Sequence, residues 1–207
     1  PKQWLEPLQV ESWGYRRKAR LGVRYVNKKD KVLVGFRERK SSFITVMDRC
    51  EVLHPLIGDN LELLGECIEK LSVKFHVPQI EVAIAELDTI LILRHLQSLT
   101  REDEVILQEY GEKLKVTWYT QSGGLETVKP LNEAVLLNYS LPDHDIKMSF
   151  LPTDFTQVNF ELNQKMINLA LQLLDLNKED EVIDLFCGLG NFTLPISRYV
   201  KSVVGIE

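Results

Sequence analysis

The sequence predicts an α+β domain with an antiparallel or mixed sheet and helices, followed by the first βαβ part of a Rossmann-like α/β domain. Two observations support this fold class. Residues 15–150 contain short β-type runs separated by turn-forming residues, with two helical stretches between them. Residues 182–186 form a short apolar run that leads into glycines, and residues 201–207 form a second run that ends on Glu207. We therefore expect two structural units with a boundary near residue 151.

The composition is that of an ordinary soluble globular protein, with 44% hydrophobic and 27% charged residues among 207. No apolar run approaches the roughly 18 residues that a membrane helix needs, and no signal peptide is visible. The three cysteines, Cys50, Cys67 and Cys187, are an odd and scattered set. Such a set argues against a disulfide framework and fits a reducing compartment, so we expect a cytoplasmic protein with no membrane partner.

Charge is distributed unevenly along the chain, although the formal net charge is only −5. Residues 1–50 contain 13 Lys and Arg against 5 Asp and Glu, whereas the remaining residues contain 12 against 25. The first quarter is therefore the part expected to face a polyanion.

Residues 1–14 are expected to be a linker or arm, and the first strand begins at Tyr15. Along residues 18–25, Lys, Arg and Gly alternate with apolar side chains, which predicts a half-buried strand with one basic face. Residues 27–30 form a turn, and residues 31–36 return as the partner strand of a hairpin. The basic residues of this segment predicted to bind RNA are Arg16, Arg17, Lys18, Arg20 and Arg24.

A basic strand face has two interpretations. Lys and Arg in a row can neutralise phosphates and give sequence-independent affinity, while Tyr15 and Tyr25 could stack on unpaired bases. Alternatively, the row belongs to a solvated edge strand on which cations deter aggregation. The density of cations, in a chain that is otherwise acidic, favours nucleic acid.

The middle of the chain continues the α+β pattern. Apolar residues at three- and four-residue steps predict a helix over residues 57–73, with Cys67 on its apolar face. A capping box that begins at Thr100 predicts a second helix to about Gly111. Hairpins are predicted for residues 80–96, 115–128 and 135–150. His76, His95 and His144 have no acid–base partner at a recognisable spacing.

The last segment, residues 151–207, contains the pattern that predicts a ligand site. A helix capped by Asn159 should pack on the first parallel strand, and that strand leads into Gly188 and Gly190, which permit close approach of a ligand. Glu207 lies 17 residues after Gly190, near the roughly 20-residue offset at which an acid reaches ribose hydroxyls. The third glycine of the dinucleotide fingerprint is missing and Asp184 precedes the turn, which favours S-adenosylmethionine over NAD; a turn that binds no nucleotide is the alternative.

Both ends of the chain suggest a piece of a larger enzyme. It begins without methionine, and it stops at the end of the second parallel strand. Two parallel strands with one crossover cannot bury both faces of a sheet. We therefore expect an incomplete domain, which could self-associate through its open sheet edge.

Several motifs together resemble the bacterial uracil-C5 RNA methyltransferases. They are Asp154-Phe-Thr-Gln-Val-Asn159, then Asn163-Gln-Lys-Met166, and then Asp184-Leu-Phe-Cys-Gly-Leu-Gly-Asn-Phe-Thr193, in that order. The likeness continues through residues 13–20, 35–37 and 93–95, so it spans nearly the whole chain. It implies that residues 15–150 form a central RNA-binding domain and that residues 151–207 begin a class I methyltransferase domain.

The resemblance also implies a cofactor, a substrate and site residues. S-adenosylmethionine would donate a methyl group to C5 of a uracil in 23S ribosomal RNA, and Gln157, Phe186 and Asn191 would contact the cofactor while Glu207 takes its ribose. Cys50 matches the fourth ligand of a [4Fe-4S] cluster in the parent enzyme, although its three companions are not in this chain.

The nucleophilic cysteine and the base would lie beyond the chain, and Cys187, which lies inside the cofactor loop without a neighbouring base, is not expected to be the nucleophile. The parent is expected to be a monomer. A tRNA or other rRNA uracil remains an alternative substrate, and an inert RNA-binding fragment or a methyltransferase of small molecules remains an alternative function. The basic strand argues against a small-molecule substrate.

Overall fold

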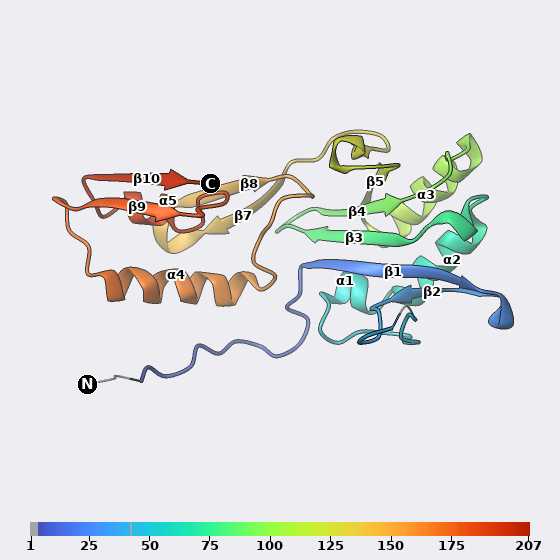
Figure 1. Cartoon of the computed structure of the whole chain (residues 1–207), viewed down its shortest axis with the longest axis horizontal. Helices are drawn as coiled ribbons and strands as arrows, with labels where there is room; N and C mark the ends of the chain where they lie inside the picture. The colour runs from blue at the N-terminus through green and yellow to red at the C-terminus, as the bar shows by residue number, and fades with distance from the viewer. Residues whose placement is uncertain (1–3, 42) are drawn as a thin grey trace.

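The computed structural model describes residues 4–41 and 43–207 and has two ends of different architecture (Figure 1). Strands β1 to β5 with helices α1 to α3 fill one end, and β7 to β10 with α4 and α5 fill the other. The N-terminal segment has no regular structure over residues 4–11 and passes α4, where Lys165 Nζ donates to the carbonyl of Gln9 at 2.8 Å. None of the helices in these residues is long and apolar enough to cross a membrane.

A six-stranded sheet in the order β2-β1-β3-β4-β5-β6 forms the first end. Adjacent strands in this sheet are antiparallel except for β4 and β5. These two strands are parallel because α3 crosses between them. The sheet is therefore mixed, and its first strand lies inside it, not at an edge. The strands are β1 (Lys18–Val26), β2 (Lys31–Gly35), β3 (Gln79–Ile84), β4 (Thr89–Arg94), β5 (Thr117–Gln121) and β6 (Lys129–Pro130).

Helices α1 (Pro55–Gly58), α2 (Leu61–Lys70) and α3 (Arg101–Leu114) accompany this sheet. The helix predicted over residues 57–73 is divided, because the chain leaves the helical path at residues 59–60. The apolar stripe of α2 is buried as predicted, and it joins Leu21, Ile80 and Leu91 of the sheet in the larger core. Burial raises the pKa of the Cys67 thiol to about 12, so this cysteine is an inert packing residue.

The start of α3 is fixed by the predicted capping box. Thr100 Oγ1 accepts from the Asp103 N–H at 3.2 Å, and Asp103 Oδ2 accepts from the Thr100 N–H at 2.9 Å. Asp103 also accepts from the backbone N–H and the hydroxyl of Ser72 at 2.6 and 2.7 Å, which joins α3 to the segment that follows α2. The helix continues past the predicted end at Gly111 and stops at Lys115, whose backbone is left-handed.

Strands β7 (Leu137–Leu141) and β8 (Ile146–Phe150) form the predicted last hairpin as a separate two-stranded sheet. The preceding predicted hairpin is only partly present, because residues 125–127 form a 3-10 helix before the short β6. The β7–β8 hairpin contacts both ends of the molecule. Ser140 donates to the Glu86 carboxylate beside β3, and Tyr139 packs in a second core with Ile167 of α4 (Phe160–Leu174). The division at residue 151 therefore stays a prediction.

The predicted βαβ unit consists of β9 (Glu181–Leu185), α5 (Thr193–Ser197) and β10 (Ser202–Ile206), with β9 and β10 parallel. One sheet face is half-buried, and α5 packs against β10. The other face is open, with exposed fractions of 66% for Ile183, 61% for Leu185, 55% for Val204 and 50% for Ile206. The apolar run of residues 182–186 is typical of a buried strand, but β9 is half-exposed here because two parallel strands with one crossover leave one sheet face uncovered.

The helix α4 also packs differently from the prediction. It buries Asn163 and Ile167, and Ile167 packs in the core that contains the β7–β8 hairpin. Leu173 and Leu174, which were expected to pack on β9, are 60% and 53% exposed. The predicted cap is confirmed, since Asn159 Oδ1 accepts from the Leu162 N–H at 3.0 Å.

Asp103 gives the fold a predicted pH dependence. Burial alone would raise the pKa of this carboxyl, but hydrogen bonds from Thr100 and Ser72 outweigh it and hold the pKa below 3.8. Such a group stabilises the fold above its unfolded pKa and loses this contribution as the pH falls through the folded pKa. Asp103→Asn should lower the free energy of unfolding by about 1–3 kcal/mol near neutral pH, and the difference should shrink below pH 3.8.

Urea denaturation of the chain across this pH range measures both effects. Asp88→Asn removes an equivalent charge from an exposed turn and should change stability little at any pH. A deficit of Asp103→Asn that stays constant with pH would contradict the assignment.

The open face of β9 and β10 should cause self-association, because exposed contiguous apolar surface favours contact between copies. Sedimentation velocity should show larger species as the concentration rises. Val204→Lys should shift the distribution toward the monomer, whereas Val105→Lys, which changes a 46% exposed valine on α3, should not. A chain that sediments as a monomer at every concentration would show that this face does not cause self-association.

Candidate functional site

The loop between β9 and α5, residues 186–192, is called the glycine loop here, and its backbone is unusual. Phe186, Gly188 and Gly190 all have left-handed conformations, with φ of 61°, 55° and 91°. This region is unfavourable for a bulky residue such as Phe186, whose side chain is also 91% exposed. The N–H groups of Phe186 and Cys187 hold the turn by donating to the Ile206 carbonyl at 2.7 and 3.2 Å. Strained, exposed side chains of this kind cluster at ligand sites.

The two glycines serve different purposes. A Cβ placed on Gly188 would meet no atom within 4 Å, so open space lies directly beside the backbone. Gly190 is buried, and a Cβ there would lie 3.3 Å from Leu194 Cγ in the following helix. Gly188 thus leaves a cradle for a ligand, while Gly190 allows the chain to turn into α5.

A cavity of about 130 Å³ lies where the glycine loop meets residues 155–157. Ligand pockets usually measure roughly 300–1,000 Å³, so this cavity forms only part of the wall of a larger, open site. It brings together four of the predicted residues. Its lining is Tyr139, Phe155, Thr156, Gln157, Phe186, Cys187, Gly188, Leu189, Asn191 and Phe192.

The two predicted carboxylates have separate places. Glu207 Oε2 accepts from the Gly188 N–H at 2.7 Å, so this carboxylate lies against the glycine loop. Asp184 Oδ2 accepts from Thr193 Oγ1 at 2.6 Å and so supports the first residue of α5. Glu207 therefore reaches the candidate site, whereas Asp184 supports the element that follows it.

Asn191 is held by two buried residues that the sequence analysis missed. Its Oδ1 accepts from Tyr139 Oη at 3.1 Å and from Asn163 Nδ2 at 2.8 Å, and its Nδ2 donates to Asn163 Oδ1 at 2.8 Å. Asn163 is 3% and Tyr139 4% exposed, and burial raises the pKa of Tyr139 to about 12, which keeps its hydroxyl a donor. A polar residue on the buried face of α4 was the available signal for Asn163; nothing in the sequence indicated Tyr139.

Cys187 occupies a packed position in the same loop. Gly205 on β10 faces its sulfur, and a Cβ on that glycine would lie only 2.9 Å from Cys187 Sγ. The side chain donates weakly to the Gly188 carbonyl at 3.7 Å. None of the described residues that line this cavity is a histidine, a lysine or a carboxylate that could act as a base for the thiol.

Two of the cations predicted to bind RNA make contacts within the protein. Arg17 Nη1 donates to the Ala85 carbonyl at 3.0 Å, and its guanidinium lies 5.0 Å from the centre of the Phe160 ring. Lys18 Nζ donates to the Asp154 carbonyl. Desolvation by burial lowers the pKa of both groups. These cations join β1 to the segment before α4, which leaves them poorly placed for phosphate.

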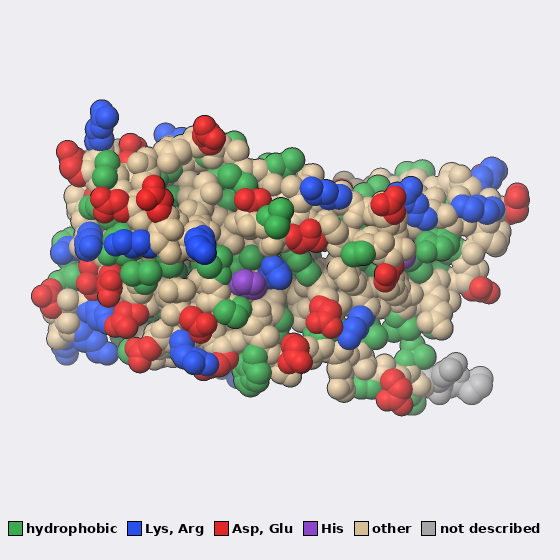
Figure 2. Space-filling model, turned by 180° about the vertical axis from the view of Figure 1, so that it is seen from behind, with side chains coloured by type: hydrophobic (Ala, Val, Ile, Leu, Met, Phe, Trp, Pro, Cys, Tyr) green, Lys and Arg blue, Asp and Glu red, His purple; other side chains and the backbone are tan. Residues whose placement is uncertain are grey.

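The other three predicted cations differ in accessibility. Arg16 Nη1 donates to the Lys18 carbonyl at 3.5 Å, and Arg20 Nε pairs with Glu81 Oε1 at 3.1 Å while its side chain stays 69% exposed. Arg24 is exposed, with its guanidinium 5.9 Å from the Phe43 ring. On the face seen in Figure 2, Lys and Arg are interspersed with Asp and Glu, so this face presents no single basic patch.

Comparison with known proteins supplies the family. The family model of tRNA (uracil-5-)-methyltransferase matches residues 10–207. The chain belongs to the tRNA (uracil-5-)-methyltransferase family. Three members of similar sequence are all called 23S rRNA (uracil(1939)-C(5))-methyltransferase RlmD. They come from Vesicomyosocius okutanii (66% identical), Nitrosococcus oceani (52%) and Stenotrophomonas maltophilia (47%).

These matches cover all of this chain. They cover only about half of each relative, namely 47%, 46% and 47% of the relatives' lengths. A solved structure shows the family fold as well: the tRNA (uracil-54, C5)-methyltransferase of Pyrococcus abyssi in complex with S-adenosyl-L-homocysteine. It matches with a TM-score of 0.67 at 17% identity, over 94% of this chain and 49% of that one. This likeness supports a mixed sheet with helices.

The family resemblance suggested Cys50 as one ligand of a cluster whose three other ligands are not in this chain, and that role stays a prediction. Cys67 is buried in α2 and Cys187 lies in the glycine loop. Within residues 4–41 and 43–207, no three His, Cys, Asp or Glu side chains are grouped to hold a metal ion. Cys50 lies in a tight turn, where its N–H donates to the Gly58 carbonyl at 2.9 Å.

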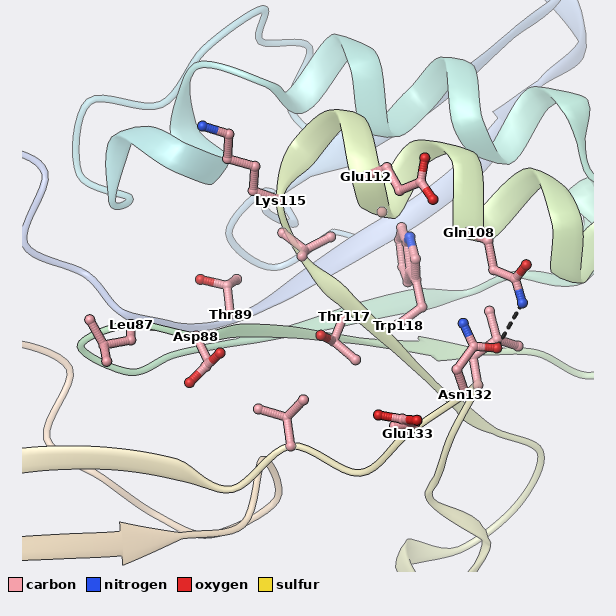
Figure 3. A pocket seen from close by; sticks show the side chains of 14 residues that line it. Leu87, Asp88, Thr89, Gln108, Glu112, Lys115, Thr117, Trp118, Asn132 and Glu133 are labelled. Atoms are coloured by element: carbon pink, nitrogen blue, oxygen red, sulfur yellow. Dashed lines mark hydrogen bonds between the residues drawn. The ribbon is translucent and has the colours of Figure 1, made fainter.

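A larger cavity, of about 610 Å³, lies beside the six-stranded sheet, away from the glycine loop (Figure 3). Its walls come from α3, β5, the turn between β3 and β4, and the segment after β6. Gln108 Nε2 donates to Asn132 Oδ1 at 2.7 Å across one side, and Trp118 Nε1 is buried without a hydrogen-bond partner. None of the predicted site residues lines this cavity, so size alone would have misplaced the site.

The Asn191 contacts predict a local effect on the glycine loop. Tyr139→Phe removes one buried hydroxyl that holds Asn191, so the amides of residues 186–192 should exchange with deuterium faster. Tyr119→Phe is the matched control, because its hydroxyl is also buried but accepts from the Val135 N–H at 2.9 Å. Each change should cost about 1–2 kcal/mol of stability. Equal loop exchange in both variants, measured by mass spectrometry, would show that Tyr139 does not hold the loop.

Proposed function

We propose that this chain is the RNA-binding part and the beginning of the catalytic part of an enzyme that methylates C5 of a uracil in 23S ribosomal RNA. S-adenosylmethionine would be the methyl donor. In this proposal residues 15–150 grip the RNA and residues 151–207 begin a class I methyltransferase domain. The support is the shared name of the relatives at 47–66% identity, together with a cofactor-compatible loop. Such an enzyme would act in the cytoplasm, as a monomer when the domain is complete.

The observation that carries the proposal is the meeting of residues 155–157 with the glycine loop around the open cradle at Gly188. An adenosyl group needs a flat apolar contact, hydrogen-bonding groups and a carboxylate for its ribose. The exposed Phe186 ring offers the first, and Gln157 and Asn191 offer the second. Glu207 offers the third from its position beside Gly188. The residues present therefore fit the cofactor.

These residues would bind and orient the cofactor and leave the bond-making groups to the rest of the enzyme. Uracil C5 becomes nucleophilic only after a thiolate adds at C6, and a base must later remove the C5 proton. Neither group is proposed within this chain, because Cys187 is packed against Gly205 without a neighbouring base. The cofactor would supply the methyl group. The chain alone would therefore bind without turnover.

The target base must leave its stack to meet the methyl group, which calls for a surface that holds the RNA backbone. We assign this role to the basic strand, and among its predicted residues the more exposed Arg20 and Arg24 are better placed than Arg17 and Lys18. The Pyrococcus enzyme acts on tRNA, but its 17% identity supports that substrate less than the relatives support 23S rRNA.

Cofactor binding tests the proposal directly. By isothermal titration calorimetry the chain should bind S-adenosylmethionine, and Glu207→Ala should weaken binding by about 10-fold or more, because the variant has no carboxylate to hydrogen-bond the ribose. Asn191→Ala should also weaken it. Glu179→Ala, at an exposed site in the loop before β9, is the control and should bind as the wild type. Unchanged affinity in Glu207→Ala and Asn191→Ala would remove the cofactor assignment.

The proposal that the nucleophile and the base lie outside this chain has its own test. The chain should transfer no labelled methyl group from S-adenosylmethionine to 23S rRNA, whereas a protein of the relatives' full length should label C5 of one uracil. Turnover by the chain alone would contradict the assignment of nucleophile and base to other residues.

A further inference from the structure

A groove of about 440 Å³ opens at the far end of the β1–β2 hairpin, away from the glycine loop. One wall is the hairpin itself, and the other is the segment of residues 43–46 that crosses beside it. Its size is within the range of pockets that hold small ligands. The groove is lined by Arg24, Tyr25, Val26, Asn27, Lys28, Lys29, Leu33, Glu38, Phe43, Ile44 and Val46.

Two glycines that face each other on neighbouring strands let the segment of residues 43–46 pack closely against the hairpin. Gly22 of β1 pairs with Gly35 of β2, so no side chain projects from the sheet at that point. The residues after Phe43 fill this gap: a Cβ on Gly22 would lie 2.3 Å from Ile44 Cδ1, and one on Gly35 would lie 3.2 Å from the Thr45 carbonyl. The crossing segment is thereby anchored beside the hairpin tip, and Phe43 is left at the groove.

The lining combines exposed apolar surface with positive charge. Phe43 is 62% and Val46 59% exposed, although large apolar side chains usually find cover. Arg24, Lys28 and Lys29 contribute three cations to the lining, against the single carboxylate of Glu38. An aromatic face within reach of several cations is the arrangement that binds a nucleobase and its phosphates together.

We propose that this groove binds one unpaired nucleotide of the RNA substrate. The base stacks on the Phe43 ring between Val46 and Leu33, and the flanking phosphates contact Lys28, Lys29 and Arg24. The charge of the groove selects a polyanion, and the aromatic face selects an unpaired base over a duplex. This inference rests on the proposed RNA substrate and adds a specific subsite to it. It also places an RNA contact at the end of β1, away from Arg17 and Lys18.

The test uses the 207-residue chain and a fluorescein-labelled, uridine-rich RNA single strand of about 12 nucleotides. Phe43→Leu keeps an apolar side chain but removes the stacking face. It should weaken binding by about 10-fold in fluorescence anisotropy, with no change in the salt dependence. Phe43→Trp should restore affinity. Trp13→Leu is the control, because Trp13 is 65% exposed but lies outside the groove.

The cations at the groove have a different signature. Lys28→Gln with Lys29→Gln should reduce the slope of log affinity against log salt by about 0.7 for each phosphate that the variant no longer neutralises. Lys129→Gln with Lys147→Gln changes the net charge equally at exposed sites on β6 and β8, and it should leave the slope nearly unchanged. Thermal unfolding confirms that each variant is folded before its affinity is interpreted.

Four outcomes decide between these possibilities. Equal affinity of Phe43→Leu and the wild type, or an equal loss of affinity in both lysine pairs, would overturn the subsite and leave the proposed methyltransferase function standing. Weaker binding by Phe43→Leu with rescue in Phe43→Trp would support it. Strong RNA binding by a chain that binds no S-adenosylmethionine would contradict the proposed cofactor while still supporting the groove.

Discussion

The amide pair between Asn191 and Asn163 is the interaction on which the candidate site depends. The two side chains donate to and accept from each other at 2.8 Å, and Tyr139 adds a third partner. Asn163 and Tyr139 are buried, and Asn191 is partly buried. Buried polar groups are costly unless they are paired, so the three residues favour one mutual arrangement. Because they come from β7, α4 and the glycine loop, that arrangement fixes where the loop lies relative to residues 155–157.

The two ends of the molecule are joined by polar contacts of a different kind. Lys18, at the start of β1, donates to the Asp154 carbonyl, and the Arg17 guanidinium lies 5.0 Å from the centre of the Phe160 ring in α4. The Glu86 carboxylate accepts from the backbone N–H and the hydroxyl of Ser140. Arg17 and Lys18 belong to the basic segment predicted to bind RNA, but they make contacts within the protein. The burial that lowers their pKa also removes them from the surface where phosphates bind, so local charge density alone overstates the RNA-binding surface.

Local patterns predicted much of the fold, and the errors have a common cause. The β1–β2 hairpin, the capping box at Thr100 and the Asn159 cap depend on neighbouring residues, and each is present as expected. The packing of α4 depends on residues distant in sequence, so its apolar stripe did not reveal its partner. Likewise the spacing of Gly190 and Glu207 located the loop. The polar residue on the buried face of α4 was a signal for Asn163, but its pairing with Asn191 and the part of Tyr139 depend on three segments that are distant in sequence.

The left-handed backbone of Phe186 affects which substitutions selection for thermal stability would favour. A bulky residue in that conformation costs roughly 1–2 kcal/mol, and glycine would adopt it freely. A screen that rewarded heat resistance alone would therefore favour Phe186→Gly. The selected proteins would be more stable but would lack the exposed ring, so thermal stability and the proposed cofactor contact of Phe186 impose opposing demands on this position.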